Sequence, residues 1–359
     1  MRWDHLRLDE AGAEGTDGAA AGCGTAGQAL FDRGAVPRTF STPGFRGMTF
    51  YEVHAKSIIN RVPATSRMAF SWTINPYRGC QHSCVYCFAR STHNYLDLDA
   101  GHDFDSKVVV KVNAPDLLRK TLASARWNGE HIAMGTNVDC YQRAEGRYQL
   151  MRGIITALRD AANPFSILTK GTLILRDLDL LTEAAQVTDV GLNVSAGFVD
   201  QELWRTLEPG TPSPERRLDT CAALTAAGLR CGVLMGPIVP FLSDSPAQLE
   251  AAVRRAADSG AAHVTPIVLH LRPGTREWYL QWLSDRHPEL VRRYQSFYGR
   301  GAYAPRAYQA QISGQVRELA ARFGVGSASP AASRRVGPPA GQTGPARRTE
   351  PEQLQLSLL

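Results

Sequence analysis

The sequence lacks any segment able to cross a membrane or direct secretion. No run of ~18 consecutive apolar residues, the length that a bilayer span needs, occurs in the chain. The opening stretch, MRWDHLRLDEAGAEG, carries acidic residues early and has no apolar core typical of a signal peptide. These absences predict a cytoplasmic protein with no membrane association.

Cysteine is scarce, with seven residues in a chain of 359. Disulfides are rare in the cytoplasm, so grouped cysteines there indicate metal binding or catalysis. Three cysteines are grouped within eight positions: Cys80, Cys84 and Cys87. The others are scattered, and because free cysteine is often buried, we expect most of them to be core residues: Cys23, Cys140, Cys221 and Cys231.

The charge of the chain is modestly positive, with a net charge of +6 and a pI near 9.0. This excess is compatible with nucleic acid or another anionic partner. An arginine-rich composition explains it equally well. The 43% hydrophobic content is enough for a sizeable core in one large or two ordinary domains.

The two ends of the chain differ in composition from its middle. Residues 10–37 are dominated by Gly and Ala without periodicity, and from Gly326 onward Pro, Gly, Ser and Arg predominate. We therefore predict a largely flexible N-terminal extension (1–55), a core (56–325) and a disordered basic tail (326–359).

Within the core, short apolar runs alternate with segments of helical period. The predicted strands are 68–74, 131–136, 165–169, 190–195, 231–236 and 263–269, with 107–112 as an extra edge strand. Helical segments separate them at 114–126, 146–162, 175–186, 213–228 and 245–260, and another follows at 275–299. The alternation predicts an α/β fold with a parallel sheet, and the apolar runs predict that both faces are covered. No G-x-G-x-x-G follows the first strand, which favours a partial (β/α)6 barrel over a doubly wound sheet.

The grouped cysteines lie in NPYRGCQHSCVYCFAR (75–90), directly after the first predicted strand. Three protein ligands leave one coordination position open for a substrate or cofactor. Soft thiolates favour zinc or an iron–sulfur cluster. His82 is an alternative fourth ligand, although ligation from such a tight loop is strained.

The C-x3-C-x2-C spacing, with Tyr86 before the third cysteine, resembles the radical S-adenosylmethionine (radical SAM) superfamily. The longer string is similar to its spore photoproduct lyase-related, DNA repair photolyase-like branch. Further blocks resemble that branch: KSIINRVP, GTNVDCYQRAE, ILTKGTLILRDLDLL and LEPGTPSPERRLDTCAALTAAGL. The resemblance extends over residues 56–270.

This resemblance implies a [4Fe–4S] cluster on Cys80, Cys84 and Cys87, with S-adenosylmethionine chelating the fourth iron. One electron, from a flavodoxin- or ferredoxin-type donor, would then cleave the sulfonium and give a 5′-deoxyadenosyl radical. The missing fourth ligand would thus be the cofactor. The protein would supply binding, orientation and electrostatics.

Candidate cofactor contacts follow from the rule that chemistry in parallel barrels sits at the carboxyl ends of the strands. Polar residues at these ends are Asp139, Lys170, Ser195, His270 and Arg272. Lys170 or Arg217 would pair with the cofactor carboxylate, while Asp139 and Ser195 would bind its amine or ribose. The family resemblance indicates Asp139, Lys170 and Ser195 as well, and it places Tyr86 beside the cofactor.

The sequence departs from the spore photoproduct lyases at Asn137. Those enzymes carry a hydrogen-donating cysteine at the matching position, two residues before the aspartate. Cys140 is the nearby candidate for such a role, although a buried thiol is its default interpretation. Three hypotheses stay open: a radical enzyme acting on DNA, one acting on a peptide, RNA or metabolite, and a non-catalytic metal-binding adaptor.

The tail ends in QLSLL, which resembles the pentapeptide that binds the bacterial DNA polymerase sliding clamp. Its anchors would be Gln355, Leu356, Leu358 and Leu359. A short motif on an unfolded tether binds through a few such anchors. The alternative is a terminal segment that packs on the protein's own surface.

Overall fold

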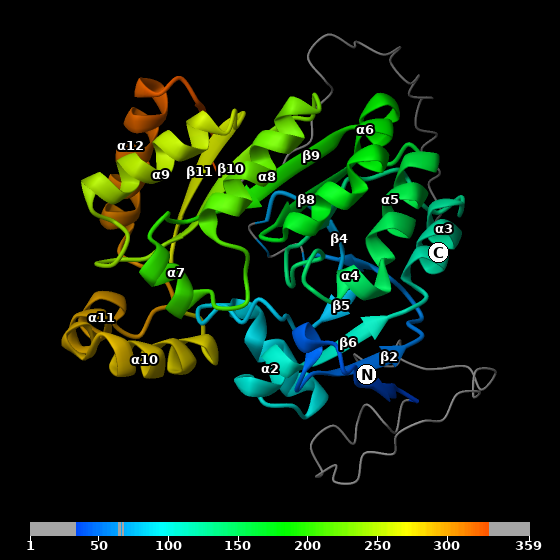
Figure 1. Ribbon diagram of the computed structural model, residues 1–359, viewed down its shortest axis with the longest axis horizontal. Helices are drawn as coiled ribbons and strands as arrows, with labels where there is room; N and C mark the ends of the chain where they lie inside the picture. The colour runs from blue at the N-terminus through cyan, green and yellow to red at the C-terminus, as the bar shows by residue number, and fades with distance from the viewer. Residues whose placement is uncertain (1–33, 64–65, 67, 330–359) are drawn as a thin grey trace, which may run out of the picture.

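The computed structural model describes residues 34–63, 66 and 68–329. Its main sheet has eight strands in the order β12-β11-β10-β9-β8-β7-β4-β3 (Figure 1). Neighbours from β12 to β4 are parallel, and β3 is antiparallel to β4. The strands are β3 (Ile59–Arg61), β4 (Trp72–Ile74), β7 (Ile132–Met134), β8 (Phe165–Thr169), β9 (Val190–Ser195), β10 (Cys231–Ile238), β11 (His263–Val268) and β12 (Gly326–Ser327).

The predicted alternation is confirmed. Its six strands are β4 and β7 to β11, in chain order and in parallel pairing. In the described part of the chain the sheet is open, with β3 and β12 at its edges. This is the arrangement expected of a partial (β/α)6 barrel.

Helices cover the outer face of this sheet (Figure 1). They form where apolar side chains recur at helical spacing and polar residues cap their ends. Ser213 and Ser245 accept hydrogen bonds from the first turns of two of them. The helices are α3 (Ala114–Leu122), α5 (Leu150–Asp160), η3 (Thr172–Asp177), α6 (Leu178–Val187), α8 (Pro214–Ala226) and α9 (Pro246–Asp258). The short helix α4 (Glu145–Tyr148) instead packs toward the second sheet, where the Tyr148 and Phe50 rings are 5.7 Å apart.

The inner face of the sheet carries small and polar residues. Ser166 pairs in register with Ala133, and Asn193 pairs with Gly232, so these small or polar residues share the inner face. They line a cavity formed by Ala133, Met134, Thr136, Ser166, Ile167, Leu168, Asn193 and Leu234. Most residues around this cavity are nonetheless buried, as are all residues of β7 and β10, which agrees with the prediction of a sheet covered on both faces. In runs such as FSILT and VGLNVS, small or polar residues alternate with large apolar residues, although each run is apolar overall.

A second sheet has the order β1-β2-β6-β5. Its strands are β1 (Val36–Arg38), β2 (Thr49–Val53), β5 (Tyr77–Arg78) and β6 (Lys107–Lys111). The segment predicted as an extra edge strand, 107–112, is thus β6, which lies between β2 and β5. Tyr51 and Val53 of β2 share one buried face with Val109 of β6, so the pairing of the two strands is stabilised by a common hydrophobic cluster.

The described part of the predicted N-terminal extension is structured, because residues 34–55 include β1 and β2. At the other boundary, β12 adds the first residues of the predicted tail to the main sheet. The division into three segments otherwise stays a prediction. Cys23 and the clamp-like motif lie outside the described residues.

Further helices lie at the lower end of Figure 1, below the main sheet. They confirm the helical prediction for 275–299. Tyr294 and Tyr298 anchor them by donating to the carbonyls of Pro240 (2.5 Å) and Leu269 (2.8 Å), just after β10 and β11. These elements are α10 (Thr275–Arg286), η4 (Pro288–Leu290) and α11 (Val291–Tyr298).

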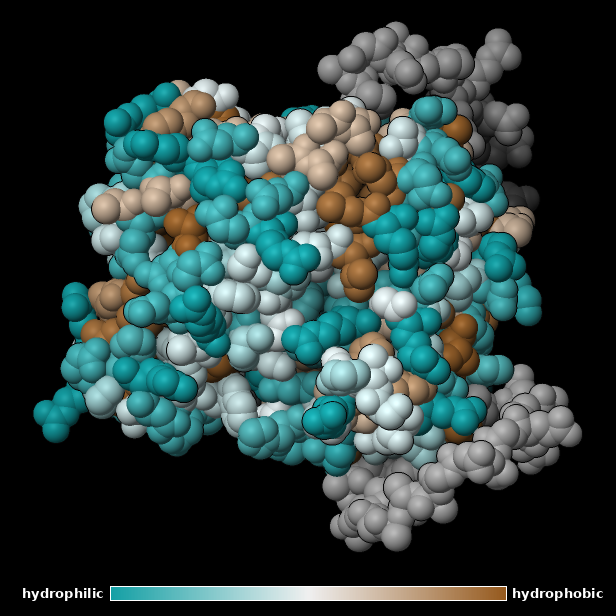
Figure 2. Space-filling model, viewed as in Figure 1, coloured by the Kyte–Doolittle hydropathy of each residue, from teal (hydrophilic) through white to brown (hydrophobic). Residues whose placement is uncertain are grey.

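The remaining helical elements are η1 (Pro43–Phe45), η2 (Phe88–Leu96), α2 (His102–Ser106), α7 (Gln201–Leu207) and α12 (Arg306–Arg322). Helix α12 packs against α9 and β11. None of the helices in the described ranges is long and apolar enough to span a bilayer. The face drawn in Figure 2 is mainly hydrophilic, with its largest hydrophobic area over the helix-covered part of the main sheet.

Candidate functional site

The cysteine loop, residues 79–87, starts where β5 ends. Gly79 has a φ of +84°, and a Cβ on it would lie 2.7 Å from the carbonyl oxygen of Lys107. Only glycine fits both conditions without strain. The Cys80 N–H donates to the Phe104 carbonyl at 3.0 Å, which fixes the start of the loop against α2.

Two glutamines hold the first half of the loop. The Gln81 N–H donates to the Gln142 side chain at 3.0 Å, and the Gln142 amide donates to the Gly79 carbonyl at 3.0 Å. On the opposite side, the Gly210 N–H donates to the His82 carbonyl at 3.1 Å. A Cβ on Gly210 would lie 2.0 Å from the Gln81 oxygen, so this close approach requires glycine.

Arg90 holds the second half of the loop from within the protein. Its side chain is fully buried, donates to the Cys84 carbonyl at 3.1 Å, and binds both oxygens of Asp105 at 2.9 Å. Such bidentate pairs combine strength with a fixed geometry. Thr275, at the start of α10, donates to the Cys87 carbonyl at 3.0 Å. The loop is therefore fixed by α2, α10 and its own continuation.

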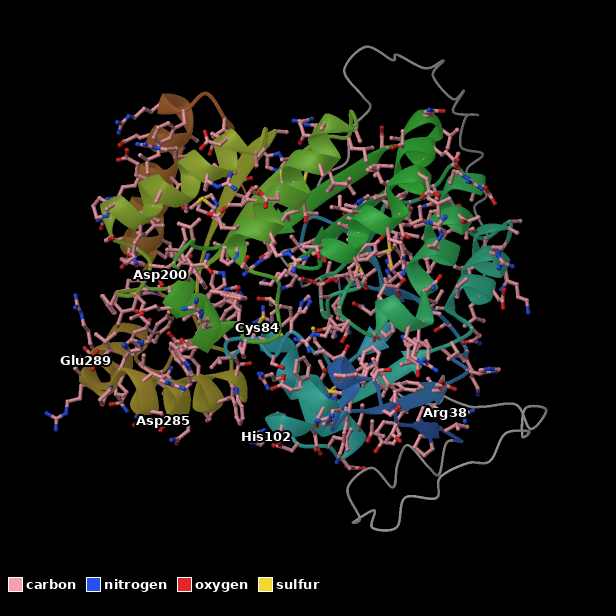
Figure 3. All side chains as sticks on the ribbon, in the orientation of Figure 1. Arg38, Cys84, His102, Asp200, Asp285 and Glu289 are labelled. Carbon is pink, nitrogen blue, oxygen red and sulfur yellow. The ribbon has the colours of Figure 1, made fainter. Side chains whose placement is uncertain are left out.

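The three thiols are free, with Cys80 and Cys84 buried and Cys87 half-buried. Cys84 lies near the centre of the molecule, between the main sheet and the lower helices (Figure 3). Burial raises the pKa of Cys84 to about 12. Burial also raises the pKa of Cys80, and the charges of Asp139, Cys87 and Cys84 raise it further. The thiolate forms therefore need a compensating positive charge, such as a metal centre supplies.

Asp139 ties the end of β7 to the cysteine loop. One carboxylate oxygen accepts from the Tyr141 N–H at 2.9 Å and the Thr169 hydroxyl at 2.6 Å. The other accepts from the Lys170 N–H at 2.6 Å and lies 3.3 Å from Nδ1 of His82. Burial alone would raise the pKa of this carboxyl, but His82 and the hydrogen bonds outweigh burial and lower it to about 2.

Lys170 and Ser195 meet at the carboxyl ends of β8 and β9. The Lys170 ammonium donates to the Ser195 hydroxyl at 2.9 Å, and that hydroxyl donates to the Gly236 carbonyl at 3.0 Å. The ammonium also lies 5.8 Å from the centre of the Tyr86 ring. Its charge acts to lower the pKa of Cys84, although burial prevails there. The Lys170 ammonium thus lies near both the thiols and the sheet edge.

Arg217 and Glu208 form a buried ion pair behind this cation. Glu208 also accepts a hydrogen bond from the Tyr86 hydroxyl, while Arg217 donates to the Ser195 carbonyl at 2.9 Å. Burial would raise the pKa of Glu208, but the charges of Arg217 and Lys170 lower it. Sequence reasoning missed Glu208, whose only signal was its place in the family-like block 207–229.

The structure brings most of the predicted residues together around the cysteine loop: Tyr86, Asp139, Lys170, Ser195 and Arg217. His82 faces Asp139. Cys140 is fully buried in the main hydrophobic cluster, and burial raises its pKa. His270 and Arg272 lie apart from this network, at the mouth of the site beside Phe88 and Tyr303. The roles of all these residues toward a cofactor stay predictions.

Residues 74–264 match the family model described as the radical SAM superfamily. The chain belongs to this superfamily. Uncharacterized protein Rv2578c of Mycobacterium tuberculosis is 46% identical over 323 residues, 90% of this chain and 93% of that protein. Uncharacterized protein MJ0683 of Methanocaldococcus jannaschii is 32% identical over 195 residues, 54% of this chain and 69% of that protein.

Solved structures of spore photoproduct lyase share the fold of this superfamily member. The complex with dinucleoside spore photoproduct has a TM-score of 0.57 at 16% identity, covering 78% of this chain and 81% of that one. A variant with bound AdoMet and dinucleoside spore photoproduct has a TM-score of 0.56 at 16% identity, covering 74% and 78%. At this identity the likeness concerns the fold alone.

The thiols fit the [4Fe–4S] cluster that radical SAM membership implies. Among the described residues, no three His, Cys, Asp or Glu side chains are arranged to share one metal ion. A cluster places a different demand on its ligands, because each thiolate binds its own iron atom. Three free thiols in one loop, two of them buried and one half-buried, with the Lys170 and Arg217 cations near Cys84, meet that demand. Cys80, Cys84 and Cys87 are the residues that would hold it.

Proposed function

We propose that this chain is an enzyme that cleaves S-adenosylmethionine reductively and acts on DNA. The observation that carries the proposal is the position of three free thiols beside the Lys170–Ser195 pair at the carboxyl edge of the sheet. Cys80, Cys84 and Cys87 would hold the cluster, which would supply one electron for reductive cleavage of the sulfonium C–S bond and thereby radical chemistry on the substrate.

Lys170 is the residue that we assign to the cofactor carboxylate. Its ammonium donates one hydrogen bond, to Ser195, of the three that such a group can make. The predicted alternative, Arg217, is buried and already donates to Pro212, Ser195 and Glu208. Lys170 therefore has donors to offer, whereas Arg217 holds the surrounding backbone.

Asp139 acts as a positioning residue. A carboxylate offers about four acceptor sites, and the four groups that surround Asp139 are provided by Tyr141, Thr169, Lys170 and His82. It thereby fixes the Lys170 backbone relative to the cysteine loop. Ser195 presents its hydroxyl at the same edge, where it can bind the amine or ribose of the cofactor.

The electron enters from a flavodoxin- or ferredoxin-type donor on the side of Cys87. This cysteine is the most exposed of the three, since Cys80 and Cys84 are buried. A cytoplasmic location follows from the requirement for such a donor.

The DNA substrate is supported by the shared fold with an enzyme solved in complex with a dinucleoside spore photoproduct. Asn137 stands where the spore photoproduct lyases have their hydrogen-donating cysteine, so we propose a different reaction on the substrate. That substitution also favours a second candidate, an enzyme acting on a peptide, RNA or metabolite.

Anaerobic reconstitution tests the proposal. The loaded protein should absorb at ~400 nm and release 5′-deoxyadenosine with S-adenosylmethionine and dithionite. Cys84→Ala should lose both signals, whereas Cys221→Ser, which removes a buried thiol outside the loop, should keep them. A fully loaded cluster that gives no 5′-deoxyadenosine would contradict the enzymatic proposal and favour the metal-binding adaptor.

A further inference from the structure

A group of aromatic and basic side chains, three exposed and one half-buried, lies at the mouth of the site. We call Phe88, His270, Arg272 and Tyr303 the mouth platform. Phe88 follows Cys87 directly, and His270 and Arg272 follow the carboxyl end of β11. Tyr303 is 56% exposed and Phe88 is 37% exposed, two of only five large hydrophobic residues that are exposed in the described part of the chain.

The members of the platform contact one another in a row. The Arg272 guanidinium lies 5.5 Å from the centre of the Phe88 ring, within the range of cation–π contacts. Its Nη2 is 3.4 Å from the Tyr303 hydroxyl. The His270 and Tyr303 rings are 5.6 Å apart and inclined by 35°. The platform thus presents two exposed aromatic rings with a cation between them.

Backbone contacts hold this row in place. His270 and Tyr303 form an antiparallel bridge, and the Leu271 N–H donates to the Ala302 carbonyl at 2.8 Å. Arg276 donates to the Gly299 and Gly301 carbonyls at 2.7 and 3.0 Å, which fixes the loop that carries Tyr303. A preorganised surface loses less conformational entropy on binding.

No carboxylate among the described residues neutralises the charge of the platform. Arg272 forms no ion pair with a carboxylate of the described residues, and the exposed Arg300 in the neighbouring loop forms none either. The acidic residue of the same segment, Glu277, accepts a hydrogen bond from the Gly274 N–H at 2.6 Å. An anion can therefore pair with Arg272 without displacing a carboxylate of the described residues.

We infer that the mouth platform binds an unpaired stretch of a nucleic acid strand, with bases stacked on Tyr303 and Phe88 and a phosphate at Arg272. Stacking on aromatic rings combined with basic residues is how single strands are bound. The inference rests on the proposed action on DNA and adds that the substrate is presented single-stranded or locally unpaired. An acidic electron-transfer protein would dock through several charges, whereas this surface offers exposed rings and few cations.

Binding of a fluorescently labelled oligothymidylate, measured by anisotropy across salt concentrations, tests the inference without any cofactor. Tyr303→Ala should weaken binding by roughly 5- to 100-fold, and Tyr303→Phe should retain it, because stacking needs only the ring. In Arg272→Ala, the slope of log affinity against log salt concentration should decrease by the contribution of about one phosphate contact. Arg254→Ala is the matched control, since Arg254 is also exposed and lies over an aromatic ring, Phe323, away from the site.

Two results would overturn the inference. One is unchanged oligothymidylate affinity in Tyr303→Ala, or an equal loss for a duplex of the same length. The other concerns the reconstituted Tyr303→Ala variant: unchanged oligothymidylate affinity, slower reduction of its cluster by flavodoxin and an unchanged rate of reduction by dithionite. That result would make the platform a docking surface for the electron donor. Because the assay needs no cluster, loss of binding in Tyr303→Ala would support the platform even if 5′-deoxyadenosine were never formed.

Discussion

Arg217 and Glu208 pair with both side chains almost completely removed from solvent, at 1% and 0% exposure. The pair connects two parts of the site. Glu208 accepts from the Tyr86 hydroxyl in the cysteine loop, and Arg217 donates to the Ser195 carbonyl at the end of β9. One ion pair on the α7–α8 segment therefore sets the distance between the thiols and the sheet edge.

Breaking this ion pair should destabilise the protein. Arg217→Met leaves the Glu208 carboxylate buried without its main cation, which costs roughly 3–5 kcal/mol in free energy of unfolding. Urea unfolding followed by circular dichroism measures the loss. The double variant Arg217→Met/Glu208→Gln should recover part of it, because no buried charge is left unpaired. A loss below ~1 kcal/mol in the single variant, the range of exposed pairs, would contradict the structural role.

Removing the Lys170 ammonium should weaken cofactor binding. A charge-assisted hydrogen bond contributes about 1.5–3 kcal/mol, so Lys170→Met should reduce the affinity for S-adenosylmethionine roughly 10- to 100-fold. Equilibrium dialysis with the reconstituted protein gives the dissociation constant. Lys120→Met, an exposed lysine on α3, serves as the control. Equal affinities for S-adenosylmethionine in the two variants would show that a residue other than Lys170 binds the cofactor carboxylate.

Adding one methyl group at Gly210 should displace the cysteine loop. The new Cβ would lie 2.0 Å from the backbone oxygen of Gln81 and cannot be accommodated by a side-chain rotation. Gly210→Ala should cost roughly 1–3 kcal/mol or more and lower the iron content after reconstitution. Gly314→Ala is the matched control, since nothing lies within 4 Å of its Cβ position in α12. That substitution should stabilise the helix by up to ~1 kcal/mol.

Acid should destabilise the fold in part through His131. Burial lowers the pKa of this side chain from 6.5 to about 4, and its Nε2 lies 3.0 Å from the Ser166 hydroxyl. Between these two pH values the unfolded chain binds more protons than the folded one, so stability falls as pH decreases from about 6.5 to about 4. His131→Gln should weaken the pH dependence of the unfolding midpoint over that range. The same substitution at the exposed His54 should leave this pH dependence unchanged. Parallel profiles would show that another group controls the acid transition.

Local patterns were enough to predict the α/β architecture and the thiol loop. The order of the strands β4 and β7 to β11 follows the apolar runs along the chain, because each run and each intervening helix has its own hydrophobic period. Cys80, Cys84 and Cys87 lie close together whatever the fold, since few residues separate them. Lys170 and Ser195 were found because the carboxyl ends of parallel strands lie at one edge of a sheet.

Contacts between distant segments decided the rest. The second sheet depends on parallel pairing of Thr49 with Lys107, which no local period reveals. The sequence by itself determined the cysteine loop typical of the superfamily and the order of strands and helices. Both depend only on the spacing of residues that are close together in the chain. Only the tertiary structure decided that Glu208 pairs with Arg217 and that Tyr303 and Arg272 form a surface beside Cys87. Those relationships depend on which helices and loops pack together, and packing is a property of the whole chain.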